Sequence, residues 1–142
     1  HLKRAVEEDK SIQGKVTIKG FILKDDIPLY LNSADIYVLA SHVESFAISP
    51  MEAMACGTVP ILTTLPCFKI MTDNGKYGLL FEPGDQKGLE EQIEKLIKDK
   101  PLLERLSRKV AIRASDHFSW KASAEKLVNL YNKVLSDKKG IK

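Results

Sequence analysis

Apolar residues along this chain follow two spacings, one typical of buried strands and one typical of amphipathic helices. Short apolar runs without polar interruption occur at 36–40, 59–62 and 78–81. Such runs are expected for strands of a parallel sheet that helices cover on both faces. At 15–21 apolar and polar residues alternate, and this pattern predicts a fourth strand.

Between these runs, apolar residues recur every three or four positions, which is the spacing of an amphipathic helix. The predicted helices lie at 1–9, 27–33, 50–56, 86–98 and 119–135, and a further helix begins at Pro101 with apolar positions up to Val110. A single helical turn is predicted at 68–71 and a basic tail at 138–142. Ser119 is placed to cap the last helix, whose apolar stripe runs from Trp120 to Val134. We expect this stripe, together with His117, to pack inward.

The alternation of strands and helices predicts an α/β fold with a parallel sheet. About four strands are visible in the sequence, fewer than the five or six of a complete doubly wound unit. One domain covering 1–142 fits the length. Because the chain begins at His1 inside a helical pattern and shows few strands, we expect it to be part of a longer protein.

Composition and charge narrow the classes of function. Hydrophobic residues make up 44% and charged residues 29% of the chain, as in ordinary soluble globular proteins. The net charge of +3 is not concentrated on one segment, so we expect no nucleic-acid binding. Cys56 and Cys67 lack the spacing of metal ligands, which predicts a reduced pair and no metal site. Without a membrane-spanning run, the chain is expected to be cytoplasmic.

Two glutamates flank the point where the strand at 36–40 gives way to a helix. Glu44 lies in the connecting loop, and Glu52 lies in the first turn of the helix that begins near Pro50. Open α/β sheets bind ligands at the carboxyl ends of their strands. Carboxylates accept hydrogen bonds from sugar hydroxyls, and backbone N–H groups at 46–49 would favour a phosphate. The pattern therefore predicts a site for a sugar or an anion.

Simpler roles stay open for the same residues. The segment from Ser49 to Glu52 matches the Ser-x-x-Glu capping box, in which the glutamate bonds back to the start of its own helix. Glu44 alone would suit a solvated loop carboxylate. His42, Lys69 and Lys76 are further candidates for phosphate contact, with an exposed surface position as the alternative for each.

The stretch Glu44-Ser-Phe-Ala-Ile-Ser-Pro-Met-Glu52-Ala-Met-Ala-Cys-Gly57 resembles the Glu-x7-Glu signature of retaining glycosyltransferases of the GT-B fold, family 4. Flanking pieces at 16–21, 34–38, 78–81 and 118–120 agree with the same family in order, so the resemblance spans nearly the whole chain. It implies the carboxy-terminal, nucleotide-sugar-binding half of such an enzyme, with a Rossmann-like parallel sheet flanked by helices.

The resemblance also implies roles for individual positions. Glu44 would be catalytic and would contact hydroxyls of the donor sugar, while Glu52 would hold the ribose hydroxyls. The remaining donor-binding positions are Ser45, Phe46, Ala47 and Ile48. No metal and no cofactor are expected, because in this family basic side chains and helix N-termini neutralise the diphosphate leaving group.

This sequence departs from the family pattern in three places. Ser45 and Ala47 stand where glycine is common, Pro60 comes one position late, and the segment 65–69 replaces a Gly-Gly-x-x-Glu loop, which affects donor selectivity. The family places the Arg and Lys that hold the diphosphate, and the acceptor-binding N-terminal domain, upstream of His1. We therefore expect this chain to be inactive on its own.

Taken together, these features predict a hexosyltransferase domain. It would bind a nucleotide-diphosphate sugar for transfer to a saccharide, lipid-linked or small-molecule acceptor. One alternative is a nucleotide-sugar epimerase or a phosphorylase on the same fold. Another is a non-catalytic interaction module, which the changes at Ser45, Ala47 and 65–69 would suit. Peripheral association of the parent protein with the cytoplasmic membrane face is left open by the mild basic charge.

Overall fold

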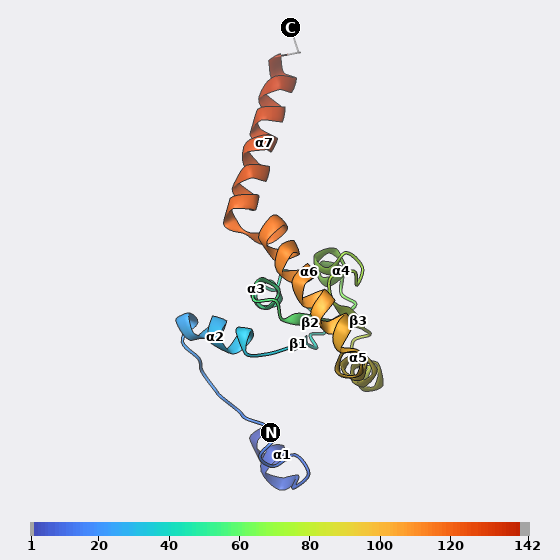
Figure 1. Cartoon of the computed structure of the whole chain (residues 1–142). Helices are drawn as coiled ribbons and strands as arrows, with labels where there is room; N and C mark the ends of the chain where they lie inside the picture. Colours follow the sequence, from blue (N-terminus) through green and yellow to red (C-terminus); the bar gives the residue numbers. More distant parts are fainter. Residues whose placement is uncertain (1, 140–142) are drawn as a thin grey trace.

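Three parallel strands form the centre of the protein (Figure 1). The structure is a computed structural model that describes residues 2–139. The strands are β1 (Ile36–Leu39), β2 (Val59–Thr63) and β3 (Leu79–Phe81), and they lie in the order β1-β2-β3. Ile36 pairs with Val59, and Ile61 pairs with Leu79. The predicted α/β class with a parallel sheet is confirmed.

Helices surround this sheet and extend beyond it. They are α1 (Leu2–Glu8), the 3-10 helix η1 (Lys24–Asp26), α2 (Ile27–Asn32), α3 (Ser49–Ala55), α4 (Pro66–Thr72), α5 (Gln86–Lys98), α6 (Lys100–Phe118) and α7 (Trp120–Lys139). The predicted basic tail is helical up to Lys139, while His1 and 140–142 lie outside the described residues. None of the described helices is both long and apolar enough to cross a membrane.

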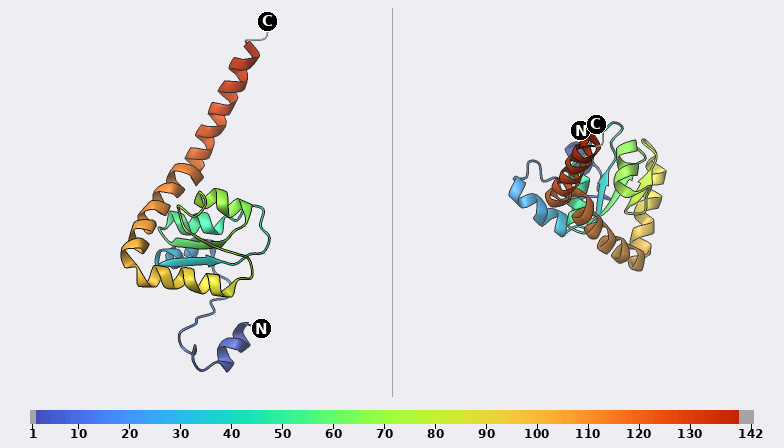
Figure 2. Two further views of the ribbon diagram at one scale, coloured as in Figure 1. Left: turned by 90° about the vertical axis from the view of Figure 1, so that its right-hand side faces the viewer. Right: turned by 90° about the horizontal axis from the view of Figure 1, so that it is seen from above.

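The core has one cluster on each face of the sheet. Met54 of α3 and Phe68 of α4 pack with Leu62 on one face. On the other face, Leu96 of α5 packs with Ile61 and its neighbours. Helix α6 serves both clusters, because its early residues join the second and its later residues join the first. The left view of Figure 2 shows α6 passing around the sheet in this way.

The strand predicted at 15–21 was wrong. This segment is irregular chain between α1 and η1, with a positive φ at Gly20, and Figure 1 shows it as a single trace leading to α2. Alternating residues favour an extended backbone, but a strand also needs a neighbour that exchanges hydrogen bonds with it. None of the described strands pairs with this segment, and Phe21 is 90% exposed.

The inward packing predicted for the last helix was also wrong. Ser119 caps α7 as expected, accepting a hydrogen bond from the Ala122 amide at 3.1 Å. The helix then leaves the body of the protein, as Figures 1 and 2 show, and α6 is the element against which its start packs. Trp120 is therefore 93% exposed and Tyr131 61% exposed, and His117 is exposed as well.

The segment after β2 is more regular than the sequence indicated. Instead of a single turn at 68–71, α4 runs from Pro66 to Thr72 and begins with proline, whose missing N–H costs nothing at a helix start. Buried Phe68 and Met71 attach α4 to the sheet. The segment that departs from the family pattern is thus the start of a packed helix.

Gly78 allows the chain to enter β3 against β2. Its φ is +142°, and an added Cβ would lie 2.7 Å from the Pro60 carbonyl oxygen and 2.9 Å from Pro60 Cγ. We expect Gly78→Ala to lower the free energy of unfolding by about 2–3 kcal/mol, because both the backbone and the contact are strained. Urea unfolding followed by circular dichroism measures the loss.

Gly84→Ala is the matched control. Its φ is +82°, yet an added Cβ would meet its nearest atom, His42 Cε1, at an ordinary 3.6 Å. We expect a loss of about 1 kcal/mol from the left-handed backbone alone. Equal losses for the two variants would show that close packing at the β2–β3 junction is not what requires glycine.

Candidate functional site

The loops that follow the three strands meet at the carboxyl edge of the sheet. The loop after β1 reaches the loop after β3, since His42 Cε1 lies 3.6 Å from where a Cβ on Gly84 would be. The Thr64 hydroxyl, just after β2, donates to Glu82 Oε2 just after β3, at 2.7 Å. These loops therefore form one continuous surface where ligands of open α/β sheets bind.

A hydrogen bond from the end of β2 holds the loop that carries Glu44. The fully buried Thr63 hydroxyl donates to the Ser41 carbonyl at 2.8 Å. Ser41 Oγ in turn donates to Glu44 Oε1 at 3.0 Å. The Cys67 thiol, in the first turn of α4, lies 3.8 Å from the Glu44 carbonyl oxygen. The Glu44 carboxylate is exposed, but its position is set by the end of β2.

Glu52 is not part of a capping box, so that interpretation of the sequence was wrong. Ile48 occupies the N-cap position of α3 in a helical conformation, and no side chain caps this helix. Ser49 lies inside the helix, where its hydroxyl accepts a hydrogen bond from Tyr37 at 2.7 Å. Within residues 2–139, no group donates a hydrogen bond to the Glu52 carboxylate, which leaves it available to a ligand.

The electrostatics of Tyr37 show that the two glutamates share one region. Burial raises the pKa of this phenol, and the negative charges of Glu52 and Glu44 raise the pKa further. Both carboxylates therefore act on the same hydroxyl, although they are carried by different elements. The structure thus places one glutamate in the loop after β1 and the other in the first turn of α3, each near enough for its charge to act on Tyr37.

The segment between the two glutamates is partly core and partly surface. Ala47 is 9% exposed and belongs to the cluster formed by α3, α4 and β2, whereas Ser45, Phe46 and Ile48 are exposed. Neither Ser45 nor Ala47 has a positive φ. A glycine is therefore not needed for the backbone conformation at either position, and the departure from the family pattern is accommodated without strain.

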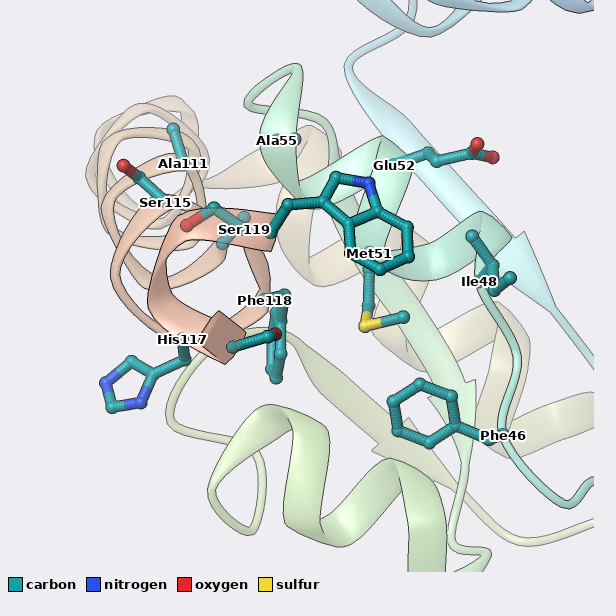
Figure 3. Close-up of a pocket in the computed structure, with 13 residues that line it drawn as sticks. Phe46, Ile48, Met51, Glu52, Ala55, Ala111, Ser115, His117, Phe118 and Ser119 are labelled. Carbon is teal, nitrogen blue, oxygen red and sulfur yellow. The ribbon is translucent and has the colours of Figure 1, made fainter. Parts of the chain in front are cut away.

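An apolar cavity of about 520 Å³ adjoins this segment, shown in Figure 3. Its lining includes Phe46, Ile48, Met51, Glu52, Phe118 and Trp120. In Figure 3 Glu52 extends away from the Phe118 wall, and the His117 ring points out of the cavity. The Arg113 guanidinium stacks on Phe118 and Tyr77, at 5.7 and 5.0 Å from the ring centroids, and so supports that wall.

Other predicted candidates lie apart from the carboxylate pair or on the surface. His42 and Lys69 are exposed, as the simpler interpretation expected. Lys76 precedes β3 at the amino-terminal edge of the sheet and pairs with Asp73 at 3.5 Å, so it does not face the carboxylates. Across the described chain, no group of three or more His, Cys, Asp or Glu residues is arranged to hold a metal ion.

Sequence reasoning missed three contributors to the site. Thr63 and Ser41 lie at strand ends, and polar residues directly after apolar runs were the available signal. Tyr37 was counted as part of an apolar strand, although its hydroxyl is the group that reaches α3. Such contacts join residues far apart in sequence and have no local pattern.

Comparisons with known proteins agree with this geometry. The family model described as Glycosyl transferases group 1 matches residues 3–113. A mannosylfructose-phosphate synthase from Agrobacterium fabrum is 32% identical over 131 residues, covering 91% of this chain and 29% of that protein. A capsular polysaccharide biosynthesis glycosyltransferase from Staphylococcus aureus is 35% identical over 119 residues, covering 83% of this chain and 31% of that protein.

A solved structure is similar along almost the whole chain. It is the sucrose-phosphate synthase from Thermosynechococcus elongatus, with a TM-score of 0.81 and 26% sequence identity. The alignment covers 96% of this chain and 34% of that one. The chain therefore spans about a third of the length of the proteins it matches.

The bond from Thr63 to Ser41 predicts unequal effects of two neighbouring changes. We expect Thr63→Val to lower the free energy of unfolding by about 1–2 kcal/mol, because the Ser41 carbonyl loses its buried donor. Thr64→Val should cost less than about 0.5 kcal/mol, because water replaces the hydroxyl at the exposed Glu82. Thermal unfolding compares them, and equal losses would contradict a supporting role for Thr63.

Proposed function

Since the chain belongs to the family of glycosyl transferases group 1, we propose that it binds a nucleotide-diphosphate sugar and presents that sugar for transfer with retention. The observation that carries the proposal is the placement of Glu44 in the loop after β1 and of Glu52 in the first turn of α3, both at the carboxyl edge of the sheet. Two unneutralised carboxylates in one region suit a ligand rich in hydroxyl groups.

Glu52 is the proposed contact to the ribose hydroxyls. Its carboxylate receives no hydrogen bond from the described residues and takes no part in capping α3. A carboxylate has two oxygens and accepts two neighbouring hydroxyls at once, which a ribose offers. Its place on a helix packed against the sheet gives it a defined direction.

Glu44 is the proposed contact to the donor sugar and the proposed catalytic residue. Its Oε1 accepts a hydrogen bond from Ser41, which leaves Oε2 to meet a sugar hydroxyl. Because Ser41 is held by the buried Thr63, the carboxylate is oriented before the ligand arrives. The backbone from Phe46 to Ile48 lies between the two glutamates in the sequence. We propose that it contacts the donor sugar and the phosphates.

The family match does not identify the base of the donor nucleotide or the acceptor of the sugar. The names of the relatives indicate different products, among them mannosylfructose phosphate and capsular polysaccharide. We propose a saccharide, lipid-linked or small-molecule acceptor, bound with the help of a further domain of a longer protein, because the chain spans about a third of its relatives.

The family match and the relatives' names favour transfer over the alternatives from the sequence. The matched family model and the named relatives describe glycosyltransferases and synthases, which supports neither an epimerase nor a phosphorylase. A non-catalytic module was suggested by Ser45, Ala47 and the segment 65–69. At Ser45 and Ala47 the backbone has no positive φ that would require glycine, so neither change strains the loop.

Glu52→Gln tests the ribose contact. We expect nucleotide binding to weaken by about 1–3 kcal/mol, roughly 5- to 150-fold in Kd, because a charge-assisted hydrogen bond is lost. The melting temperature should stay unchanged, since Glu52 does not cap α3. Saturation-transfer NMR of the chain with UDP, GDP and ADP measures binding, and differential scanning calorimetry measures stability.

Glu91→Gln is the matched control, because this exposed glutamate of α5 belongs to the helix on the opposite face of the sheet. It should leave binding unchanged. A Glu52→Gln protein that binds the nucleotide as well as the wild type would exclude the ribose role, and one that mainly melts earlier would return Glu52 to a structural role.

A further inference from the structure

Tyr37 connects the first strand to the helix that carries Glu52. It is the second residue of β1, opposite Pro60 in the sheet, and its ring packs against the core cluster beneath α3. The hydroxyl at the end of this ring donates a hydrogen bond to Ser49 Oγ at 2.7 Å. Ser49 is the first residue of α3, so the bond joins the strand to the first helical turn.

The start of α3 has no side-chain cap, and its other restraints are the burial of Pro50 and the packing of the helix on α6. The helix has seven residues, no side chain caps it, and Pro50 has no N–H to donate. Short helices are marginal without tertiary contacts, and their ends open first. In the described part of the chain, the Tyr37–Ser49 pair is the one side-chain hydrogen bond between β1 and α3. It adds a side-chain bond at the end of the helix, where opening of a helix begins.

The surroundings of Tyr37 keep its hydroxyl protonated. Burial, Glu52 and Glu44 all raise the pKa of the phenol above its ordinary value of 10.0, although the bond to Ser49 lowers it. At neutral pH the group is therefore a hydrogen-bond donor. The bond to Ser49 places this hydroxyl at the first turn of α3.

We propose that Tyr37 is a positioning residue of the donor site. By holding Ser49, it fixes the first turn of α3 relative to the end of β1, and with it the separation between Glu52 and Glu44. A ligand that contacts both carboxylates needs this separation to be constant, since small misplacements of binding groups weaken recognition strongly. The inference rests on the proposed function of the glutamate pair.

The first test needs no ligand. The Met51 and Glu52 amides donate to the Ile48 carbonyl at 2.9 and 3.1 Å, and their hydrogen exchange reports opening of the first turn. We expect Tyr37→Phe to speed exchange of both amides about five- to tenfold, because the ring stays and the bond is lost. Tyr131→Phe, on the exposed face of α7, is the control and should change neither amide.

The second test measures affinity for whichever of UDP, GDP and ADP the wild-type chain binds. We expect Tyr37→Phe and Ser49→Ala each to weaken binding about five- to tenfold. The double variant should be no weaker than either single one, because both changes remove the same bond. Ser49→Thr keeps a hydroxyl and should restore most of the affinity. A purely structural role would lower the melting temperature without this pattern in Kd.

Each outcome decides a separate point. Unchanged exchange of Met51 and Glu52 in Tyr37→Phe overturns the positioning role, and so does faster exchange with unchanged affinity. Additive losses in the double variant also overturn it, because the two side chains would then act independently. If the wild type binds none of the three nucleotides, the proposed function fails, and the exchange measurement then decides by itself whether Tyr37 holds α3.

Discussion

The burial of β2 is the constraint on which the structure depends. All five residues of this strand are inaccessible to solvent, so it must be flanked by two strands and covered on both faces. Helices α3 and α4 cover one face, and α5 covers the other, with α6 contributing to both. The last residue of the strand, Thr63, uses its buried hydroxyl to hold the Ser41 carbonyl. The central strand thus organises the core and also fixes the loop that carries the first glutamate.

The candidate site follows from this arrangement, because parallel strands bring their carboxyl ends to one edge. The loop after β1 supplies Glu44, and the first turn of α3 supplies Glu52. Two bonds from the sheet, Thr63 to Ser41 and Tyr37 to Ser49, attach to the loop and the helix that carry these carboxylates. The GT-B fold expected from the sequence is confirmed by the family match and by the similarity to a solved sucrose-phosphate synthase. For the two glutamates we propose the roles of binding the ribose and the donor sugar.

The sequence correctly predicted the fully buried strands and the helices whose apolar spacing is visible within a short segment. Strands β1 to β3 were visible as continuous apolar runs, and the helix of Glu52 was visible between them. The strand at 15–21 and the inward packing of the apolar stripe of α7 were wrongly predicted. A strand needs a neighbouring strand and an apolar stripe needs a surface that covers it, and the described chain provides neither. The capping box failed for a different reason. Ser49 has the right spacing to Glu52, but Tyr37, twelve residues earlier, holds its hydroxyl, and no local pattern reveals such a contact.

The most direct test of the account is an NMR titration of the 15N-labelled chain with UDP, GDP and ADP, in which every assigned amide is followed. If the glutamate pair binds the nucleotide, we expect saturable shifts for one nucleotide, concentrated in the loop at 40–48 and in the first turn of α3 at Ser49–Glu52. Saturable shifts that instead gather at the amino-terminal edge of the sheet, around Lys76, or along α7 would contradict it, because the glutamate pair would then not be the binding site.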